Sequence, residues 1–155
     1  MEYVTFYDVT QAGYRHWWVP VIGLVITAVA VGKIRYKWRL VGHPAFLLIF
    51  SVIWTTVSFL STYLDFRRLS STLETGRCEV VEGKITGFQI LPSTGSQKAE
   101  EFVVAGTHFQ YSGYEASAGF NQMHSRGGPI RESLLVRIHH LHGEIARLEI
   151  AAATM

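Results

Sequence analysis

The chain is very poor in cysteine and asparagine. Cys78 is the only cysteine among 155 residues. A single cysteine excludes an internal disulfide and a cysteine-rich metal site. Asn121 is the only asparagine, and Gln122 and Met123 follow it. The sequence therefore contains no Asn-x-Ser/Thr acceptor for N-glycosylation.

An excess of one charge is also missing. The chain carries 14 Lys and Arg against 12 Asp and Glu, which gives a formal net charge of +2. Outside one short segment the basic residues are scattered along the sequence, so they do not form the basic patch that nucleic acid attracts. We therefore predict no nucleic-acid partner.

Two long stretches, residues 17–32 and 45–64, contain no charged residue. A helix needs about 20 apolar residues to cross a bilayer, and the second stretch meets this length by itself. Ile34, Tyr36 and Trp38 extend the first. Inside lipid the backbone must satisfy its own hydrogen bonds, so both stretches should be helical. The sequence predicts a two-helix transmembrane hairpin, because two buried helices in a soluble protein would need a larger core than this short chain can build.

A basic segment joins the two stretches and predicts their orientation. Its four cations are Lys33, Arg35, Lys37 and Arg39. The opposite side has Arg15, Arg67 and Arg68, with Arg77 at the margin, so the positive-inside rule favours the joining loop in the cytoplasm. Both termini and the soluble domain would then be extracytoplasmic. The first 16 residues contain Glu2 and Asp8 but only one basic residue, so we expect an uncleaved signal anchor.

Small and hydroxyl residues form a stripe on the second stretch. Its members are Ser51, Thr55, Ser58 and Thr62, spaced 4, 3 and 4 residues apart, and the first stretch offers Gly23 and Thr27. Such residues let helices approach closely and hydrogen-bond across the contact. We predict that these six positions pack the two helices together, and a homo-oligomer built on the stripe is the alternative. A conduction path would need charged groups in the middle of the helices, and the sequence places none there.

From residue 77 the pattern changes to short β-type runs separated by Gly, Pro and Ser. The predicted strands cover residues 79–90, 101–104, 107–112, 118–122, 134–140 and 144–150, with a loop over 91–99. Ala105-Gly106 and His142-Gly143 stand at the turns of two hairpins. Within the first strand the apolar positions change phase, and Gly83 and Gly87 permit a bulge there.

The predicted fold class is an α+β membrane protein, in which a two-helix transmembrane hairpin carries a small antiparallel β-barrel or sandwich domain. The segments are a tail (1–16), the first transmembrane helix (17–38), a basic loop (39–43, with 33–38 at its membrane edge), the second transmembrane helix (44–66), a linker (67–76), the β-domain (77–151) and a tail (152–155).

The β-domain contains segments that carry a family resemblance. They are Val81-Glu82-Gly83-Lys84-Ile85, Glu101-Phe102-Val103-Val104-Ala105-Gly106, Phe109-Gln110-Tyr111-Ser112, Gly119-Phe120, Gly127-Gly128-Pro129-Ile130 and Val136-Arg137-Ile138. In this order they resemble a group of uncharacterised small bacterial inner-membrane proteins that join membrane helices to an all-β domain of unknown function. The resemblance implies a bacterial inner-membrane setting and transfers no catalytic residue, because the shared positions are glycines and apolar residues.

Histidine supplies the sharpest polar cluster of the β-domain. The candidate metal ligands are His108, His124, His140 and His142. Zinc needs three or four such ligands that converge on one point. Exposed histidines at the end of a hairpin are the ordinary alternative, so we expect no metal site and no cofactor.

The remaining polar motifs favour structural roles. Residues 125–130 contain two consecutive glycines between Arg126 and Arg131 but lack the strand–loop–helix context of a phosphate loop, so we expect a tight connection. Arg137 is expected to pair with Glu82 or Glu149. No Gly-x-Ser-x-Gly elbow is present, and we predict no catalytic residue.

Together these patterns predict a non-enzymatic, membrane-anchored binding or accessory protein. Its partners would be the lipid bilayer and either an unknown protein or further copies of the chain. The alternatives are a histidine-based metal sensor or enzyme, and an accessory subunit of a larger membrane complex.

Overall fold

The computed structural model describes residues 2–36, 43–91 and 98–152. The chain divides into two compact units. One unit contains Met1–Gly13 together with Asp65–Met155, and the other contains Tyr14–Leu64. The segment 39–42 of the predicted basic loop, together with Lys37 and Trp38, lies outside the described residues, as do residues 92–97 of the predicted loop 91–99.

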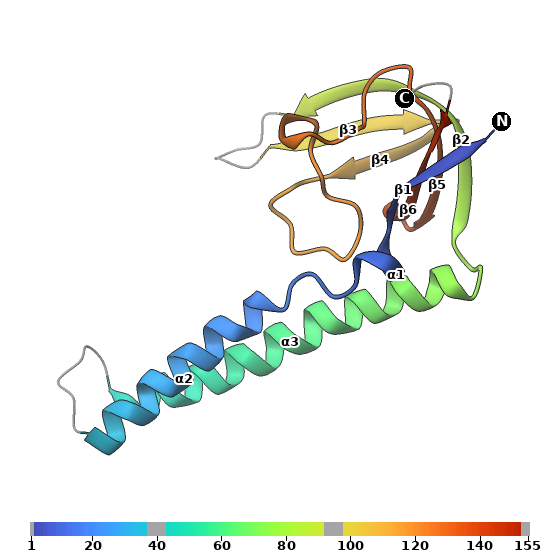
Figure 1. Ribbon diagram of the computed structural model, residues 1–155. Helices are drawn as coiled ribbons and strands as arrows, with labels where there is room; N and C mark the ends of the chain where they lie inside the picture. The colour runs from blue at the N-terminus through green and yellow to red at the C-terminus, as the bar shows by residue number, and fades with distance from the viewer. Residues whose placement is uncertain (1, 37–42, 92–97, 153–155) are drawn as a thin grey trace. The chain divides into compact units, whose positions relative to one another are not determined.

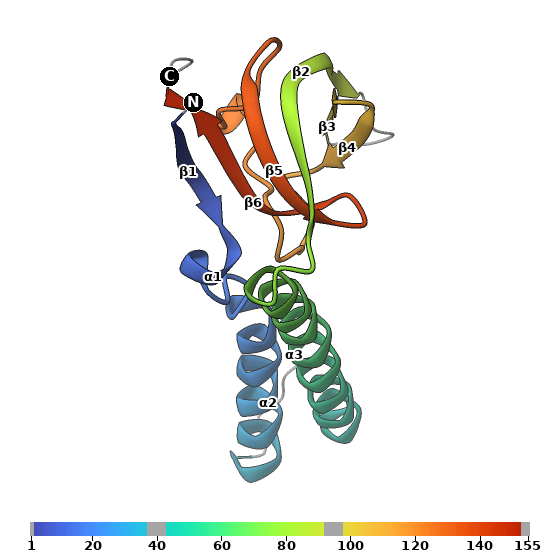
Figure 2. The same cartoon turned by 90° about the vertical axis from the view of Figure 1, so that its right-hand side faces the viewer.

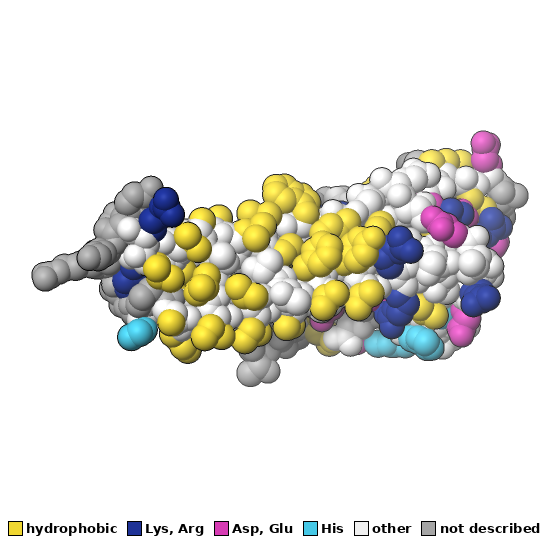
Figure 3. Space-filling view, turned by 90° about the horizontal axis from the view of Figure 1, so that it is seen from below, with side chains coloured by type: hydrophobic (Ala, Val, Ile, Leu, Met, Phe, Trp, Pro, Cys, Tyr) yellow, Lys and Arg dark blue, Asp and Glu magenta, His cyan; other side chains and the backbone are white. Residues whose placement is uncertain are grey.

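The unit Tyr14–Leu64, which we call the helical unit, consists of helix α2 (Trp18–Tyr36) and most of helix α3 (Pro44–Glu74) (Figure 1). Pro44 occupies the first helical position, where its missing N–H costs no hydrogen bond. Both helices are long and apolar enough to cross a membrane, over Trp18–Arg35 and Ala45–Glu74. Figure 3 shows hydrophobic side chains along the visible face of the helices.

The other unit, which we call the β-unit, contains one six-stranded antiparallel sheet with the order β1-β6-β5-β2-β3-β4 (Figures 1 and 2). Its strands are β1 (Tyr3–Asp8), β2 (Glu79–Leu91), β3 (Ala99–Val104), β4 (Thr107–Tyr111), β5 (Leu135–Leu141) and β6 (Glu144–Ala151). Two short helices complete it, α1 (Val9–Ala12) and the 3-10 turn η1 (His124–Arg126). The α+β class is thereby confirmed.

The sheet is open, so the predicted barrel is wrong. Among the described residues, the edge strands β1 and β4 do not pair with each other. The long strand β2 joins two halves of the sheet, because it pairs with β5 from Glu79 to Lys84 and with β3 from Ile85 to Leu91 (Figure 2). The register between β2 and β3 shifts after Thr86, next to Gly87 at φ +63°. The bulge expected from the sequence is therefore present, and it bends the strand.

Both predicted hairpins are present with tight two-residue turns. Ala105 and Gly106 have φ values of 48° and 85°, and His142 and Gly143 have 51° and 88°. Two successive positive φ angles give the turn whose twist matches antiparallel strands. Side chains of β3 and β5 alternate strictly between buried and half-buried, so one face of these strands lies on the core.

The last turns of α3 contribute to the core of this unit. Leu69 and Leu73 are buried among the side chains of the sheet. Residues 67–74 are therefore helical, although the sequence suggested a linker over 67–76 and a helix that ends at residue 66. Serine and threonine can remain inside a helix when their hydroxyls bond carbonyls of the preceding turn. Here the Ser71 and Thr72 hydroxyls both donate to the Arg68 carbonyl, at 3.0 and 2.8 Å.

Two further segments differ from the sequence prediction. Residues 3–8 of the predicted tail form β1, which pairs with β6 at the edge of the sheet. No strand forms over residues 118–122, where Phe120 makes one backbone hydrogen bond, to the Ile145 carbonyl at 2.9 Å. Phe120 instead packs its ring against Tyr7 and Tyr111, with centroids 5.6 and 5.3 Å apart. These aromatic contacts bury Phe120 although its segment forms no strand.

Candidate functional site

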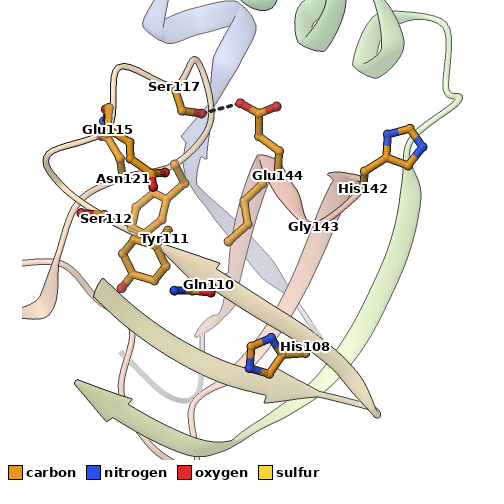
Figure 4. A pocket seen from close by; sticks show the side chains of 12 residues that line it. His108, Gln110, Tyr111, Ser112, Glu115, Ser117, Asn121, His142, Gly143 and Glu144 are labelled. Carbon is orange, nitrogen blue, oxygen red and sulfur yellow. Dashed lines mark hydrogen bonds between the residues drawn. The ribbon is translucent and has the colours of Figure 1, made fainter. Parts of the chain in front are cut away.

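The β-unit contains an open pocket of about 370 Å³ beside the edge strand β4 (Figure 4). Its lining comes from β4, from the loop that follows, from the turn between β5 and β6, and from the first residues of β6. The lining residues are His108, Gln110, Tyr111, Ser112, Glu115, Ser117, Phe120, Asn121, His142, Gly143, Glu144 and Ile145. We call this cavity the β4 pocket. Its size falls in the range of small-molecule sites, and its described lining includes two carboxylates but no Lys or Arg.

Glu144 is the most constrained acid of the β4 pocket. Its carboxylate accepts hydrogen bonds from the Ser117 hydroxyl, drawn in Figure 4, and from Arg68 Nη2 at 2.9 Å. Arg68 also pairs with Asp65 at 3.2 Å, and Asp65 accepts the Ala118 N–H at 3.1 Å. The loop wall of the pocket is thus tied to the end of α3 by ionic contacts. These contacts occupy the Glu144 carboxylate and leave Glu115 as the exposed acid of the lining.

A buried carboxylate anchors the loop after β4. Glu100 on β3 is fully buried, and it accepts the Tyr111 hydroxyl and the His124 backbone N–H, the latter at 2.9 and 3.0 Å. Burial and the hydrogen bond to Glu100 raise the pKa of the Tyr111 phenol. A buried charge is stabilised only when hydrogen bonds satisfy it, so these donors fix the position of the loop. Glu100 lies just before the predicted strand 101–104, and a charged residue at that position gives no local sign of burial, so its role could not be predicted from the sequence.

The four candidate metal ligands do not form one cluster. His108 and His142 both line the β4 pocket, and Figure 4 shows them on separate walls, β4 and the hairpin turn. His124 lies on η1 with its ring against Phe88, at 5.9 Å between centroids. The described part of the chain contains no group of three or more His, Cys, Asp or Glu side chains that could hold a metal ion.

His140 is buried on β5 and has an unusual environment. Its ring packs edge-on against Phe109 at 5.0 Å, and its Nδ1 accepts the Gly143 N–H at 3.4 Å. The Nε2 atom is buried, lies 3.9 Å from the Glu79 carboxylate and forms no hydrogen bond within the part of the chain that the structure describes. Burial lowers the His140 pKa, while Glu79 acts in the opposite direction. The neutral ring therefore supports the turn that lines the β4 pocket.

Of the six predicted helix-packing residues, four contact one another between α2 and α3, namely Gly23, Thr27, Ser51 and Thr55. Thr27 donates to Ser51 Oγ at 2.9 Å. Gly23 approaches Thr55 so closely that a Cβ at Gly23 would collide with the Thr55 hydroxyl. Tyr14 shares a hydrogen bond of 2.6 Å with Thr62, and Thr62 in turn donates to the Ser58 carbonyl at 2.7 Å.

The other polar motifs have structural surroundings. Arg137 pairs with Glu82 at 2.9 Å and with Glu149 at 3.6 Å, as predicted. In the segment 125–130, Gly127 has φ +82°, and a Cβ at Gly128 would collide with the Gln122 carbonyl. This glycine pair is therefore required by a close approach of the backbone, in agreement with a tight connection.

Comparisons of the chain with protein-family models, with curated proteins and with solved structures gave no match. The resemblance to uncharacterised bacterial inner-membrane proteins accordingly stays a prediction, and the function is inferred from the geometry.

Proposed function

We propose that the chain is a non-enzymatic, membrane-anchored binding protein, in which the helical unit crosses the bilayer twice and the β-unit binds a partner. The observation that carries the proposal is the distribution of exposed apolar side chains. Of the 24 large hydrophobic residues that are exposed among the described residues, 19 lie between Trp17 and Leu64. Each such side chain that remains in water loses about 1.5–3 kcal/mol of the hydrophobic stabilisation that full burial would provide.

The polar groups of the helical unit support the same conclusion. The Thr27, Ser51, Thr55 and Thr62 hydroxyls donate to or accept from groups of the same two helices or of Tyr14. The exposed faces carry side chains such as Leu24, Phe46 and Ile53 instead. A lipid environment solvates such faces, and it penalises backbone or hydroxyl groups that lack partners.

The β4 pocket favours binding over catalysis. Two hydroxyls of the described lining bond a carboxylate: the Tyr111 hydroxyl donates to the buried Glu100, and the Ser117 hydroxyl donates to Glu144. The Glu144 carboxylate is already paired with Arg68, and the Ser117 oxygen accepts the Gly119 N–H at 3.0 Å. An activated nucleophile needs a free base that is oriented by a third group. The pocket instead offers amide, imidazole and hydroxyl groups of the kind that fix a bound partner.

The proposed setting is a bacterial inner membrane with both termini on the extracytoplasmic side. Lys33 and Arg35 at the end of α2 support this orientation, since cations accumulate in cytoplasmic loops. A reporter fused after Met155 tests it. Active alkaline phosphatase with a dark fluorescent protein is expected, and the opposite pair of results would contradict the orientation.

Site-specific photo-cross-linking in intact cells tests the binding role. A photoreactive amino acid at Asn121, in the β4 pocket, is expected to give one product of defined mass. The matched position is Ser125, which is exposed outside the pocket. A product of twice the chain mass would identify a second copy, and another mass a different protein. Equal labelling at both positions, or none at Asn121, would refute binding through this pocket.

A further inference from the structure

A second cavity lies at the end of α3, where the helix leaves its uncharged stretch. It has a volume of about 280 Å³ and is lined by Thr10, Phe66, Arg67, Ser70, Ser71 and Glu74. We call it the helix-end groove. Arg67, Ser70, Ser71 and Glu74 are spaced 3, 1 and 3 residues apart, which places them on one face of the helix. All six residues belong to the β-unit.

Two groups of the helix-end groove are suited to an anion. Arg67 is exposed and forms no ion pair with any other described residue, whereas its neighbour Arg68 pairs with Asp65 and Glu144. Ser70 is only 8% exposed, and its hydroxyl is buried with no hydrogen-bond partner among the described residues. Buried hydroxyls are nearly always hydrogen-bonded, so an unpaired one in a groove points to a missing acceptor. A guanidinium and a free O–H together match the oxygens of a phosphate group.

The other polar groups of the helix-end groove are suited to a cation. Glu74 is exposed and forms no ion pair within the described residues. Thr10 donates its hydroxyl hydrogen to Asp8 at 2.5 Å and Ser71 donates to the Arg68 carbonyl at 3.0 Å, so both oxygens are left as acceptors. A carboxylate with two acceptor oxygens can take the three hydrogens of a primary ammonium group.

The position of the groove relates it to the bilayer surface. Arg67 follows Leu64, the last residue of the uncharged stretch, by three residues, or about 4.5 Å along the helix axis. Interfacial arginines at such positions lie at the level of the headgroups. We propose that the helix-end groove binds the headgroup of a phospholipid that carries both a phosphodiester and a primary ammonium group. This inference rests on the proposed membrane anchoring.

Native mass spectrometry of the full chain in mild detergent tests the inference. The probes are dihexanoyl phosphatidylethanolamine, dihexanoyl phosphatidylcholine and acyl-free glycerophosphoethanolamine. The wild type is expected to retain the ethanolamine lipid about tenfold better than the choline lipid, whose ammonium has no N–H. Equal retention of the two lipids would overturn the proposal.

Variants test the phosphate contact and the ammonium contact one at a time. Arg67→Gln should weaken both lipids about tenfold, because it removes one charge-assisted hydrogen bond to phosphate. Glu74→Gln should abolish the preference for ethanolamine and leave choline-lipid retention unchanged. The matched controls are Arg77→Gln and Glu115→Gln, two exposed residues outside the groove. Retention by Arg67→Gln equal to that of Arg77→Gln would overturn the phosphate contact.

Ser70→Ala distinguishes a ligand contact from a structural role. Because the hydroxyl has no partner in residues 2–36, 43–91 and 98–152, its removal should leave the urea midpoint unchanged or higher while lipid retention falls. A lowered midpoint with unchanged retention would contradict the proposal. The membrane proposal fails separately if alkaline carbonate extracts the chain from membranes. Arg67-dependent binding of glycerophosphoethanolamine would then still support recognition of the headgroup.

Discussion

The buried carboxylate of Glu100 offers the strictest test of how the β4 pocket is held. Glu100 accepts two donors, the Tyr111 hydroxyl and the His124 N–H. In Glu100→Gln one of the two acceptor oxygens becomes an NH₂ group, so one of these donors faces another donor. An unsatisfied buried donor costs about 1–3 kcal/mol, and the charged partner adds to this value. We expect the free energy of unfolding of the β-unit to fall by about 2–4 kcal/mol.

A double-mutant cycle sharpens this prediction. Tyr111→Phe removes one donor, so in the double variant the side-chain carbonyl that Glu100→Gln retains is free to accept the His124 N–H. The double variant should therefore lose about 1 kcal/mol less than the sum of the single variants. Pulse proteolysis across a urea series, on the full chain in mild detergent, measures each value. Glu115→Gln is the matched control and should change stability by no more than about 0.5 kcal/mol. A Glu100→Gln variant as stable as this control would refute the reasoning.

Three further predictions follow from close contacts and buried groups. Gly23→Leu should push α2 away from Thr55 and lower the free energy of unfolding by about 1–3 kcal/mol, measured by circular dichroism in an SDS titration. Ala28→Leu, at an exposed position of the same helix, should leave this free energy unchanged. Equal effects of the two substitutions would contradict the contact. Burial lowers the His140 pKa in the folded state. The contribution of neutral His140 to the free energy of unfolding is therefore fully present above its unfolded-state pKa of about 6.5, and it is lost as pH falls below that value. The urea midpoint of the wild type should fall from pH 8 to pH 5, and that of His140→Gln should fall less steeply. Equal pH dependence in the two proteins would argue against a role of His140. Gly143→Ala, at φ +88°, should lower the urea midpoint by the equivalent of about 1–2 kcal/mol, and an unchanged midpoint would show that the turn tolerates a Cβ.

Local patterns in the sequence were sufficient for the helices and for both hairpins. Uncharged length predicted α2 and α3, and Ala105-Gly106 and His142-Gly143 predicted the two turns. Gly83 and Gly87 predicted a bulge in β2, and it lies at Gly87. Each of these signals is carried by residues close together in the chain, which is why sequence reasoning could find them.

Features that depend on distant partners were not predictable. Strand β1 forms because it pairs with β6, which is more than 130 residues away in the sequence. The end of α3 looks like a Ser/Thr-rich linker until Leu69 and Leu73 are seen in the core. Closure of a sheet is also a long-range property, so the number of strands alone did not separate a barrel from an open sheet.

The candidate sites also combine residues that the sequence could identify with contacts that only the fold reveals. The sequence identified His108 and His142, but only the fold places both in one pocket with Glu144. Arg67 and Arg68 are adjacent and look equivalent in the sequence. In the structure Arg68 pairs with Asp65 and Glu144, while Arg67 lines the helix-end groove.

The most direct test of the account measures how deep α3 lies in a bilayer. Trp54 is the tenth residue of the uncharged stretch 45–64 and is exposed on the helix. A variant in which Trp17, Trp18 and Trp38 are replaced by Phe reports on Trp54 alone, and a second variant that retains only Trp18 serves as the interfacial control. In vesicles of brominated lipids, Trp54 should be quenched most strongly by bromine near the acyl-chain ends, and Trp18 by bromine near the headgroups. Equal and weak quenching of Trp54 at every bromine depth would contradict a membrane-spanning hairpin.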